Sequence, residues 1–219
     1  MKLAVLISGS GSNLQAFIDA SNTGLLQADI ALVLSNKPDA LGLQRASQAG
    51  IATAVVDHRN YPQREDFDQA MLDAMAPHQV DLVILAGFMR ILTPLFLAAF
   101  RGRLLNIHPS LLPKYPGLHT HQRAIDAGDA CAGATVHFVT EELDGGPPVL
   151  HAPVAISPQD TAASLAARVQ SREHRIYPLA AQWFVEGRLL LSDGAALLDG
   201  EVLPPQGLNL DEIDAGQAD

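Results

Sequence analysis

Short apolar runs alternate with amphipathic segments along the first half of the chain. Such runs are typical of strands buried on both faces, and apolar residues at helical spacing between them predict helices. The expected strands are 3–7, 30–34, 51–56, 80–86 and 104–107. The expected helices are 14–20, 40–49, 63–76 and a short one that starts at Thr93-Pro94. This order predicts an α/β fold, a Rossmann-like doubly wound and mostly parallel sheet.

The second half follows a different pattern. A short helix is expected near 122–127, then antiparallel strands at 135–140 and 149–156. Asp160 offers a cap for a long helix from Thr161, which Pro178 should kink or divide. After Leu189 we expect short strands. A single domain over 1–205 and an acidic, flexible tail over 206–219 complete the prediction.

Composition narrows the class of protein. With 219 residues, 48% of them hydrophobic, the chain buries one substantial core. Its one cysteine and the lack of a signal-peptide pattern predict a cytoplasmic protein without a disulfide framework. No apolar stretch reaches the roughly 18 residues of a membrane span. The net charge of -10 opposes polyanions, so we expect small-molecule substrates and neither nucleic acid nor membrane as partner.

A glycine-rich loop at 9–13, GSGSN, follows the first expected strand. Backbone N–H groups and the start of a helix favour an anion at such a loop. A dinucleotide fingerprint would need a third glycine where Leu14 stands, and an acidic residue after the second strand. The loop therefore predicts a monophosphate site. The alternative is a tight turn in which Ser12 or Asn13 caps the helix.

The segment RLLNIHPSLLPKYPG at 103–117 carries the strongest chemical signal. Alternation along a strand puts Asn106 and His108 on one face at its carboxyl end, where open α/β sheets bind ligands. The prolines that follow stiffen the next loop. The alternative is a histidine that only satisfies core hydrogen bonds or caps an element.

A run of carboxylates, EELDGG at 141–146, offers His108 a partner. A carboxylate beside an imidazole stabilises the protonated form and holds the tautomer, so the histidine can act as an acid. Asp144 is the candidate because the glycines after it let the backbone approach closely. Glu141 and Glu142 are expected to form a solvated acidic turn.

For the remaining candidate residues, no local motif indicates a single function. His119, His121 and His137 do not have the spacing of a metal site, so we expect no metal and hydrogen bonds to loop backbone instead. The polar segment 170–173 is typical of a solvent-facing helix surface. The segment 88–92 follows a strand end and offers apolar residues to an aromatic ligand.

Five strings together resemble the phosphoribosylglycinamide formyltransferase family of purine biosynthesis: SGSGSNLQA, LAGFMRIL, RLLNIHPSLLPKYPGLHTH, VHFVTEELDGGP and RVQSREHRIYPL. The N-x-H-P-S-L-L-P run followed by D-G-G is shared among formyltetrahydrofolate-dependent enzymes. The S-G-x-G-S-N start narrows the resemblance to the glycinamide branch. One departure is Ser10, where asparagine is common in the family.

The resemblance implies transfer of the formyl group of 10-formyltetrahydrofolate to the amine of N1-(5-phosphoribosyl)glycinamide, by a monomer or weak homodimer. It implies a catalytic group of Asn106, His108 and Asp144. The implied contacts of the phosphorylated substrate are Gly11, Ser12, Asn13, Gln170, Ser171, Arg172 and Glu173, the last against the glycinamide. The implied folate contacts are Arg64, Met89, Arg90, Ile91, Leu92, Asn106, Thr140, Glu141, Glu142, Leu143 and Asp144.

Several other activities are alternatives. Formyltransferases that act on aminoacylated tRNA or nucleotide sugars, and formyltetrahydrofolate hydrolases, resemble the same core but usually carry a further domain. A phosphometabolite sensor and a nicotinamide-dependent oxidoreductase belong to other classes. Leu14 argues against the dinucleotide, and the complete catalytic group argues against a sensor.

Overall fold

The structure is a computed structural model in which residues 1–216 are described. The chain falls into two compact units, Met1–Asn106 and Ile107–Asp219. The first unit contains the predicted alternation of strands and helices, and the second contains the later strands and the long helix.

The first unit is built on parallel strands in the order β5-β4-β1-β2-β3. These strands are β1 (Lys2–Ile7), β2 (Asp29–Ser35), β3 (Thr53–Val55), β4 (Leu82–Leu85) and β5 (Leu104–His108), the last of which runs into the second unit. The helices between them are α1 (Ser12–Asn22), α2 (Leu41–Gln48), α3 (Arg64–Met75) and α4 (Pro94–Ala99). Every strand and helix predicted for this half is confirmed.

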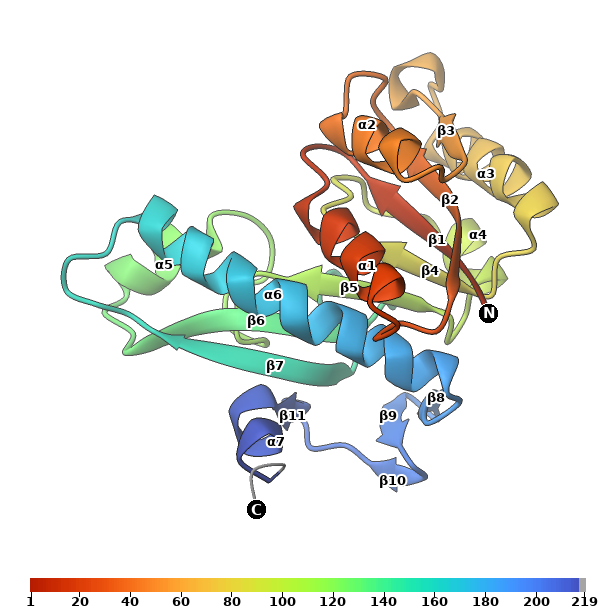
Figure 1. The fold of residues 1–219 in the computed structure, drawn as a ribbon. Helices are drawn as coiled ribbons and strands as arrows, with labels where there is room; N and C mark the ends of the chain where they lie inside the picture. The colour runs from red at the N-terminus through yellow and green to blue at the C-terminus, as the bar shows by residue number, and fades with distance from the viewer. Residues whose placement is uncertain (217–219) are drawn as a thin grey trace. The chain divides into compact units, whose positions relative to one another are not determined.

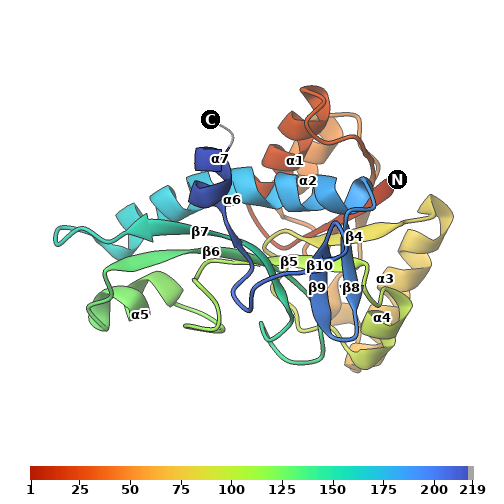
Figure 2. The same ribbon diagram turned by 90° about the horizontal axis from the view of Figure 1, so that it is seen from below.

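The strand order decides which helices share a face. Because parallel crossovers are right-handed, the helices after β1 and β2 cover one face, and those after β3 and β4 cover the other. Accordingly α1 packs on α2 and α3 packs on α4, as Figure 2 shows. The strand order reverses between β1 and β4. The carboxyl ends of these two strands therefore flank the crevice where open α/β sheets bind ligands.

The second unit packs a long helix on antiparallel strands. Strands β6 (Cys131–Phe138) and β7 (Pro148–Ala155) are antiparallel, as expected, and β11 (Leu208–Asn209) adds to β7 in parallel. Helix α5 (Thr120–Asp126) precedes β6, and α6 (Ala162–Val185) lies along both long strands (Figure 1). A small sheet of β8 (Leu189–Ser192), β9 (Ala195–Leu198) and β10 (Glu201–Val202) precedes the final helix, α7 (Leu210–Gly216).

Helix α6 corrects two expectations. Its N-cap is Thr161, which exchanges hydrogen bonds with Ser164. Asp160 lies before the cap and accepts a hydrogen bond from the Ser164 hydroxyl. The helix also runs unbroken through Pro178, which is buried within it. A proline inside a helix costs about 3 kcal/mol, so the packing of the buried face outweighs that cost here. Over residues 1–216, no helix combines the length and apolar character that crossing a bilayer requires.

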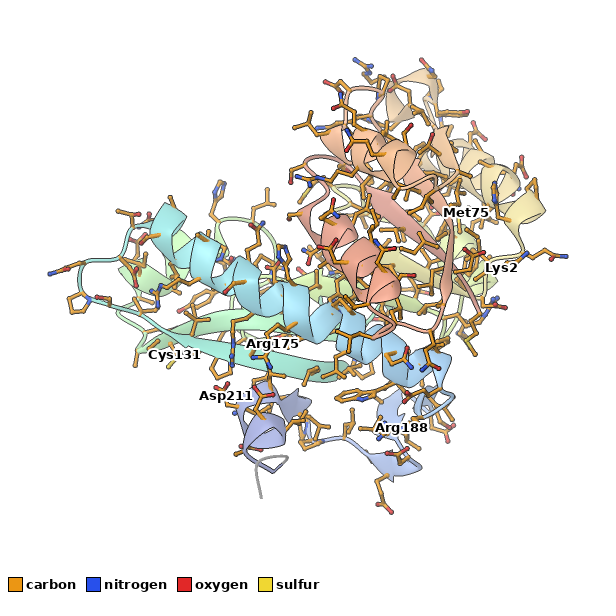
Figure 3. The ribbon with its side chains drawn as sticks, in the orientation of Figure 1. Lys2, Met75, Cys131, Arg175, Arg188 and Asp211 are labelled. Atoms are coloured by element: carbon orange, nitrogen blue, oxygen red, sulfur yellow. The ribbon has the colours of Figure 1, made fainter. Side chains whose placement is uncertain are left out.

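Within the segment from residue 206 to Gly216, which was expected to be a flexible tail, the structure has β11 and α7. Leu210 is buried, and Asp214 pairs with Arg175 of α6 at 3.0 Å. Asp211 pairs with Arg172, and Figure 3 labels Asp211 on α7 and Arg175 on α6. The acidic residues thus find arginines 39 positions earlier, which local sequence does not reveal. Residues 217–219 lie outside the described part of the chain.

Candidate active site

The loop between β1 and α1 has the geometry of a phosphate-binding turn. Gly11 is the N-cap of α1, at φ 70°, so the alternative in which Ser12 or Asn13 caps the helix is wrong. A Cβ on Gly11 would lie 2.6 Å from the Cα of Gly42 on α2, so only glycine allows this approach. Arg45 of α2 donates from Nε to the Ser10 carbonyl at 2.9 Å. The start of α1 is therefore held open to an anion.

Buried hydrogen bonds join the carboxyl ends of β1, β2 and β4. The backbone N–H of Met89 donates to Ser8 Oγ at 2.8 Å, and the Ser8 hydroxyl donates to Asn36 Oδ1 at 2.6 Å. Ser8 is 5% exposed and Asn36 is 1% exposed. Because Ser8 follows β1 and Met89 follows β4, these bonds fix both sides of the crevice at the reversal of strand order.

The segment 88–92 presents an apolar surface beside this crevice. Met89 and Ile91 are 63% and 58% exposed, whereas Phe88 and Leu92 are buried. Arg64, the first residue of α3, donates from Nη2 to the Ile91 carbonyl at 2.7 Å. The structure thus brings Arg64 to the predicted folate segment. The Leu92 side chain faces the core, so a ligand contact there would have to use its backbone.

A buried carboxylate anchors the end of this segment. Asp68 of α3 accepts from the Thr93 backbone N–H at 2.6 Å and from the Thr93 hydroxyl at 2.7 Å, both through Oδ2. Thr93 is the N-cap of α4, as predicted. Burial raises the pKa of the Asp68 carboxyl, and the two bonds from Thr93 partly oppose this shift.

In the second unit, His108 at the end of β5 meets Asp144 from the loop between β6 and β7. His108 Nδ1 lies 3.4 Å from Asp144 Oδ2, and the two side chains are 7% and 8% exposed. The backbone N–H of Gly117 donates to the same carboxylate oxygen at 2.9 Å. The predicted pairing of this imidazole with this carboxylate is confirmed as a contact.

The second ring nitrogen of His108 has a different partner. Nε2 lies 2.9 Å from the carbonyl oxygen of Tyr115. A carbonyl only accepts, so Nε2 carries a hydrogen and the neutral ring has its lone pair on Nδ1, facing Asp144. A carboxylate beside that lone pair is favourable only with a proton between them. The His108–Asp144 contact is therefore built to hold a proton at Nδ1.

The backbone of the Asp144 turn explains the glycines that follow it. Asp144 itself has φ 52°, and a Cβ on Gly146 would lie 1.8 Å from the Phe138 carbonyl oxygen. This close approach of the backbone confirms the expectation for Gly146. Glu141 and Glu142 are exposed, which confirms the solvated turn expected for them.

The other histidines near this pair differ in their surroundings. His137 Nδ1 bonds the Phe138 carbonyl at 2.8 Å, as expected for a loop-bonding histidine, and its Nε2 lies 3.9 Å from Asp144 Oδ1. Burial lowers the pKa of His137, so this ring is neutral near pH 7. Burial, and then the charge of His108, lowers the pKa of His121. Within residues 1–216, no three or more His, Cys, Asp or Glu side chains gather as metal ligands would.

The predicted substrate contacts of α6 do not share one surface. Gln170 and Glu173 are three residues apart and therefore neighbours on one face of the helix, and Glu173 is buried. Ser171 donates its hydroxyl to the Arg168 carbonyl, while Arg172 is engaged by α7. On β5, Asn106 precedes His108 by two residues, so alternation directs both side chains to one face.

Several residues that support the glycine loop, the crevice and His108 were not predicted from the sequence. They are Ser8, Asn36, Gly42, Arg45, Tyr115 and Asp129. Most of them act on elements distant in sequence. Ser8 and Tyr115 had a signal, because Ser8 opens the S-G-x-G-S-N start and Tyr115 lies in the proline-rich loop that follows His108.

A Rossmann-like unit with a glycine loop at the start of a helix, and a second unit with a buried pair of histidine and aspartate, are features of an α/β enzyme. The chain belongs to the formyl transferase family, whose sequence model matches residues 1–181. This match runs through both units as one block. It confirms the predicted family and agrees with the expectation of a single domain.

Individual relatives agree with this assignment. A phosphoribosylglycinamide formyltransferase of Escherichia coli K12 is 53% identical over 97% of this chain and 100% of its own length. One of Haemophilus influenzae is 54% identical over 94% of this chain and 97% of its own length. The solved structure of the Coxiella burnetii phosphoribosylglycinamide formyltransferase has a TM-score of 0.92 and 45% identity, and the match covers 95% of this chain and 98% of that one. The predicted α/β fold is thereby confirmed.

Proposed function

We propose that this formyltransferase moves the formyl group of 10-formyltetrahydrofolate to the amine of N1-(5-phosphoribosyl)glycinamide, a step of de novo purine biosynthesis. The observation that carries the proposal is the buried contact of His108 with Asp144, in a chain that matches enzymes of this name over nearly its whole length. The glycine loop at the start of α1 supports a phosphorylated substrate.

The reaction needs an oxyanion stabiliser and an acid. The neutral amine attacks the formyl carbon, the carbonyl electrons move to oxygen to form a tetrahedral oxyanion, and the attacking nitrogen releases its extra proton to solvent, from which His108 is reprotonated after the transfer. The Asn106 amide donates to this oxygen, a kind of contribution worth roughly 10²- to 10³-fold in rate. When the bond from carbon to the folate nitrogen breaks, that nitrogen takes a proton. His108 supplies it from Nδ1, and a placed acid of this kind contributes roughly 10²- to 10⁴-fold.

Asp144 keeps His108 ready for this step. Its carboxylate beside Nδ1 favours the imidazolium before the transfer, and the Gly117 N–H keeps the carboxylate in place. We assign the substrate phosphate to Gly11, Ser12 and Asn13. The folate is assigned to the exposed face of 88–92 and to the turn 140–144, and the glycinamide to Glu173 with its neighbours on α6.

The test is an assay of the purified chain with both substrates. We expect 10-formyltetrahydrofolate to lose its formyl group, followed by absorbance, and the formylated glycinamide to appear in equal amount by mass spectrometry. A reaction without the glycinamide substrate, and one with formylatable aminoacyl-tRNA in its place, are the controls. Formate release without transfer would favour a hydrolase, and transfer to tRNA would favour the alternative acceptor. Inactivity of folded protein would refute the proposal.

A further inference from the structure

The carbonyl that holds His108 belongs to a residue with a strained backbone. Tyr115 has φ 55°, in the left-handed region that costs a residue with a side chain roughly 1–2 kcal/mol. In this conformation its carbonyl oxygen lies 2.9 Å from His108 Nε2. Such a conformation persists only where the surrounding contacts fix it, so the contacts of Tyr115 show what maintains the bond to His108.

Asp129, which follows α5, supplies the main contacts of the Tyr115 side chain. The Tyr115 hydroxyl donates to Asp129 Oδ2 at 2.8 Å. Lys114 Nζ donates to the two oxygens of the same carboxylate at 2.9 and 3.0 Å. The bonds from Lys114 and Tyr115 lower the pKa of Asp129, so this carboxylate is charged near pH 7. One carboxylate thus holds two consecutive residues of the loop after His108.

The peptide groups on both sides of Tyr115 are fixed as well. The Ser110 hydroxyl donates to the Lys114 carbonyl at 2.6 Å. Arg123 of α5 donates from Nη1 to the Pro116 carbonyl at 2.6 Å, and its guanidinium carbon lies 5.1 Å from the centre of the Tyr115 ring. This cation–π contact covers the ring that Asp129 holds at its hydroxyl. The direction of the Tyr115 carbonyl is therefore determined by the side chain and by both neighbouring peptides.

We propose that Asp129 and Tyr115 are positioning residues that keep the Nε2 hydrogen on His108, so that the proton which this imidazolium gives up is the one on Nδ1. The inference rests on the proposed function of His108 as the acid. Asp129 holds the Tyr115 ring, the ring holds the left-handed backbone, and the carbonyl accepts from Nε2. Without that acceptor, His108 exchanges its hydrogen between both nitrogens and loses the fixed direction of Nδ1.

The direct measurement is long-range proton–nitrogen NMR of the histidine rings in ¹⁵N-labelled protein, which distinguishes the two neutral tautomers. We expect the neutral form of wild-type His108 to be the Nε2–H tautomer. Tyr115→Phe removes only the hydroxyl, and Asp129→Ala removes the carboxylate. Both variants should populate the Nδ1–H tautomer, and kcat should fall about tenfold, within the range that small misplacement of a catalytic group produces. KM for both substrates should stay within about twofold.

Three further variants separate positioning from a structural role. Asp129→Asn keeps an acceptor for the Tyr115 hydroxyl and should keep the wild-type tautomer. Lys114→Met removes the other partner of Asp129 and should do the same. Asp126→Ala, at the exposed end of α5, removes only a bond from Gln122 on its own helix and is the matched control. A double variant, Tyr115→Phe with Asp129→Ala, should be no slower than the slower single variant.

An unchanged His108 tautomer in folded Tyr115→Phe would overturn the proposal, whatever the activity. Tyr115→Phe keeps the ring under Arg123, so it provides the test even if Asp129→Ala does not fold. The NMR result also separates this proposal from the proposed function. If the wild-type protein transferred no formyl group, the function would fail while the tautomer would still report on Tyr115 and Asp129.

Discussion

At the scale of single residues, His108 is defined by the character of its two partners. Tyr115 offers a carbonyl oxygen that only accepts, and Asp144 offers a carboxylate, so both neighbours favour hydrogens on the ring. The contact to Tyr115 is 2.9 Å and the one to Asp144 is 3.4 Å. The shorter contact is the one at Nε2, which agrees with a hydrogen that stays on this nitrogen.

Asp144→Asn tests this arrangement because it preserves shape and removes charge. The asparagine oxygen can still accept from Gly117, so the variant should fold normally. Its amide can donate to Nδ1, which stabilises the neutral ring that cannot act as an acid. We expect kcat to fall roughly 10²-fold or more with little change in KM, in line with the loss of a general acid. Steady-state kinetics and the protonated fraction of His108 by NMR measure the effect.

The control for this substitution is the same change at another aspartate in the left-handed region. Asp193→Asn, in the exposed turn between β8 and β9 at φ 50°, also removes a carboxylate, and the variant should keep wild-type kinetics. If Asp144→Asn kept its activity within a few-fold of wild type, or left the protonation of His108 unchanged, Asp144 would be only a turn residue and the proposed mechanism would be wrong.

At the scale of elements, the segment 88–92 is held at three points. Ser8 of the first loop binds its start, Arg64 binds the Ile91 carbonyl, and Asp68 binds Thr93 just after its end. The two exposed apolar side chains between these points, Met89 and Ile91, are thereby presented on a fixed backbone. A preorganised apolar surface of this kind costs little to order when a flat ligand binds.

Ile91→Asp tests the ligand assignment of this segment without damaging the core. Ile91 is 58% exposed, so a charge there should leave stability nearly unchanged while it opposes an apolar ligand. We expect KM for 10-formyltetrahydrofolate to rise at least tenfold and KM for the phosphorylated substrate to stay within about twofold. Leu95→Asp, at an apolar position on α4 that is 41% exposed, is the control. A folate KM equal to that of the control would remove the assignment.

Asp68 provides a prediction about pH. Burial raises the pKa of Asp68 in the folded state above the ordinary value of 3.8. Between pH 3.8 and the raised pKa, the folded chain therefore binds more protons than the unfolded chain. The contribution of Asp68 to the free energy of unfolding therefore falls as pH rises through that window. Asp68→Asn keeps an acceptor for Thr93 and removes the buried charge. The variant should be at least as stable as wild type at pH 7.

Thermal unfolding between pH 4 and pH 7 measures this difference. The stability of Asp68→Asn relative to wild type should increase with pH, and Asp66→Asn, exposed on the same helix, should show no such trend. A relative stability that decreases with rising pH would mean that the bonds from Thr93 outweigh burial and that the inferred direction is wrong.

The elements and site residues that the sequence predicts are those that depend on local patterns. The strands and helices of the first unit follow from local periodicity, and the glycine loop and Asn106 with His108 follow from their place at strand ends. The pairing with Asp144 needed the family resemblance to single out one carboxylate among three. Pro178 shows the limit of local rules, since its buried packing in α6 overrides its intrinsic cost. Tyr115 and Asp129 meet through folding alone.

At the scale of the whole molecule, the chain combines two units of different construction. The first is a parallel α/β unit whose strand order creates a crevice, and the second is an antiparallel unit whose turn brings Asp144 to His108. We thus assign the substrate phosphate to the first unit and proton transfer to the second. Substitutions in the glycine loop should therefore act on substrate affinity, whereas substitutions around His108 should act on turnover.

The C-terminal segment offers a last prediction, about stability. Ending the chain after Gln206 removes β11 and α7, and with them the buried Leu210 and the backbone pairing of β11 with β7. Full burial of a leucine contributes about 1.5–3 kcal/mol, whereas exposed ion pairs such as Arg175 with Asp214 contribute at most about 1 kcal/mol. We expect urea titration to show a loss of about 2–4 kcal/mol in the free energy of unfolding. Arg175→Gln alone should lower the free energy of unfolding by less than about 1 kcal/mol.

The assigned catalytic residues all precede the cut, so kcat should be retained where the truncated chain is folded. A truncated chain as stable as wild type would show that β11 and α7 add nothing to the stability of the second unit. The segment would then behave energetically like the flexible acidic tail that the sequence predicts.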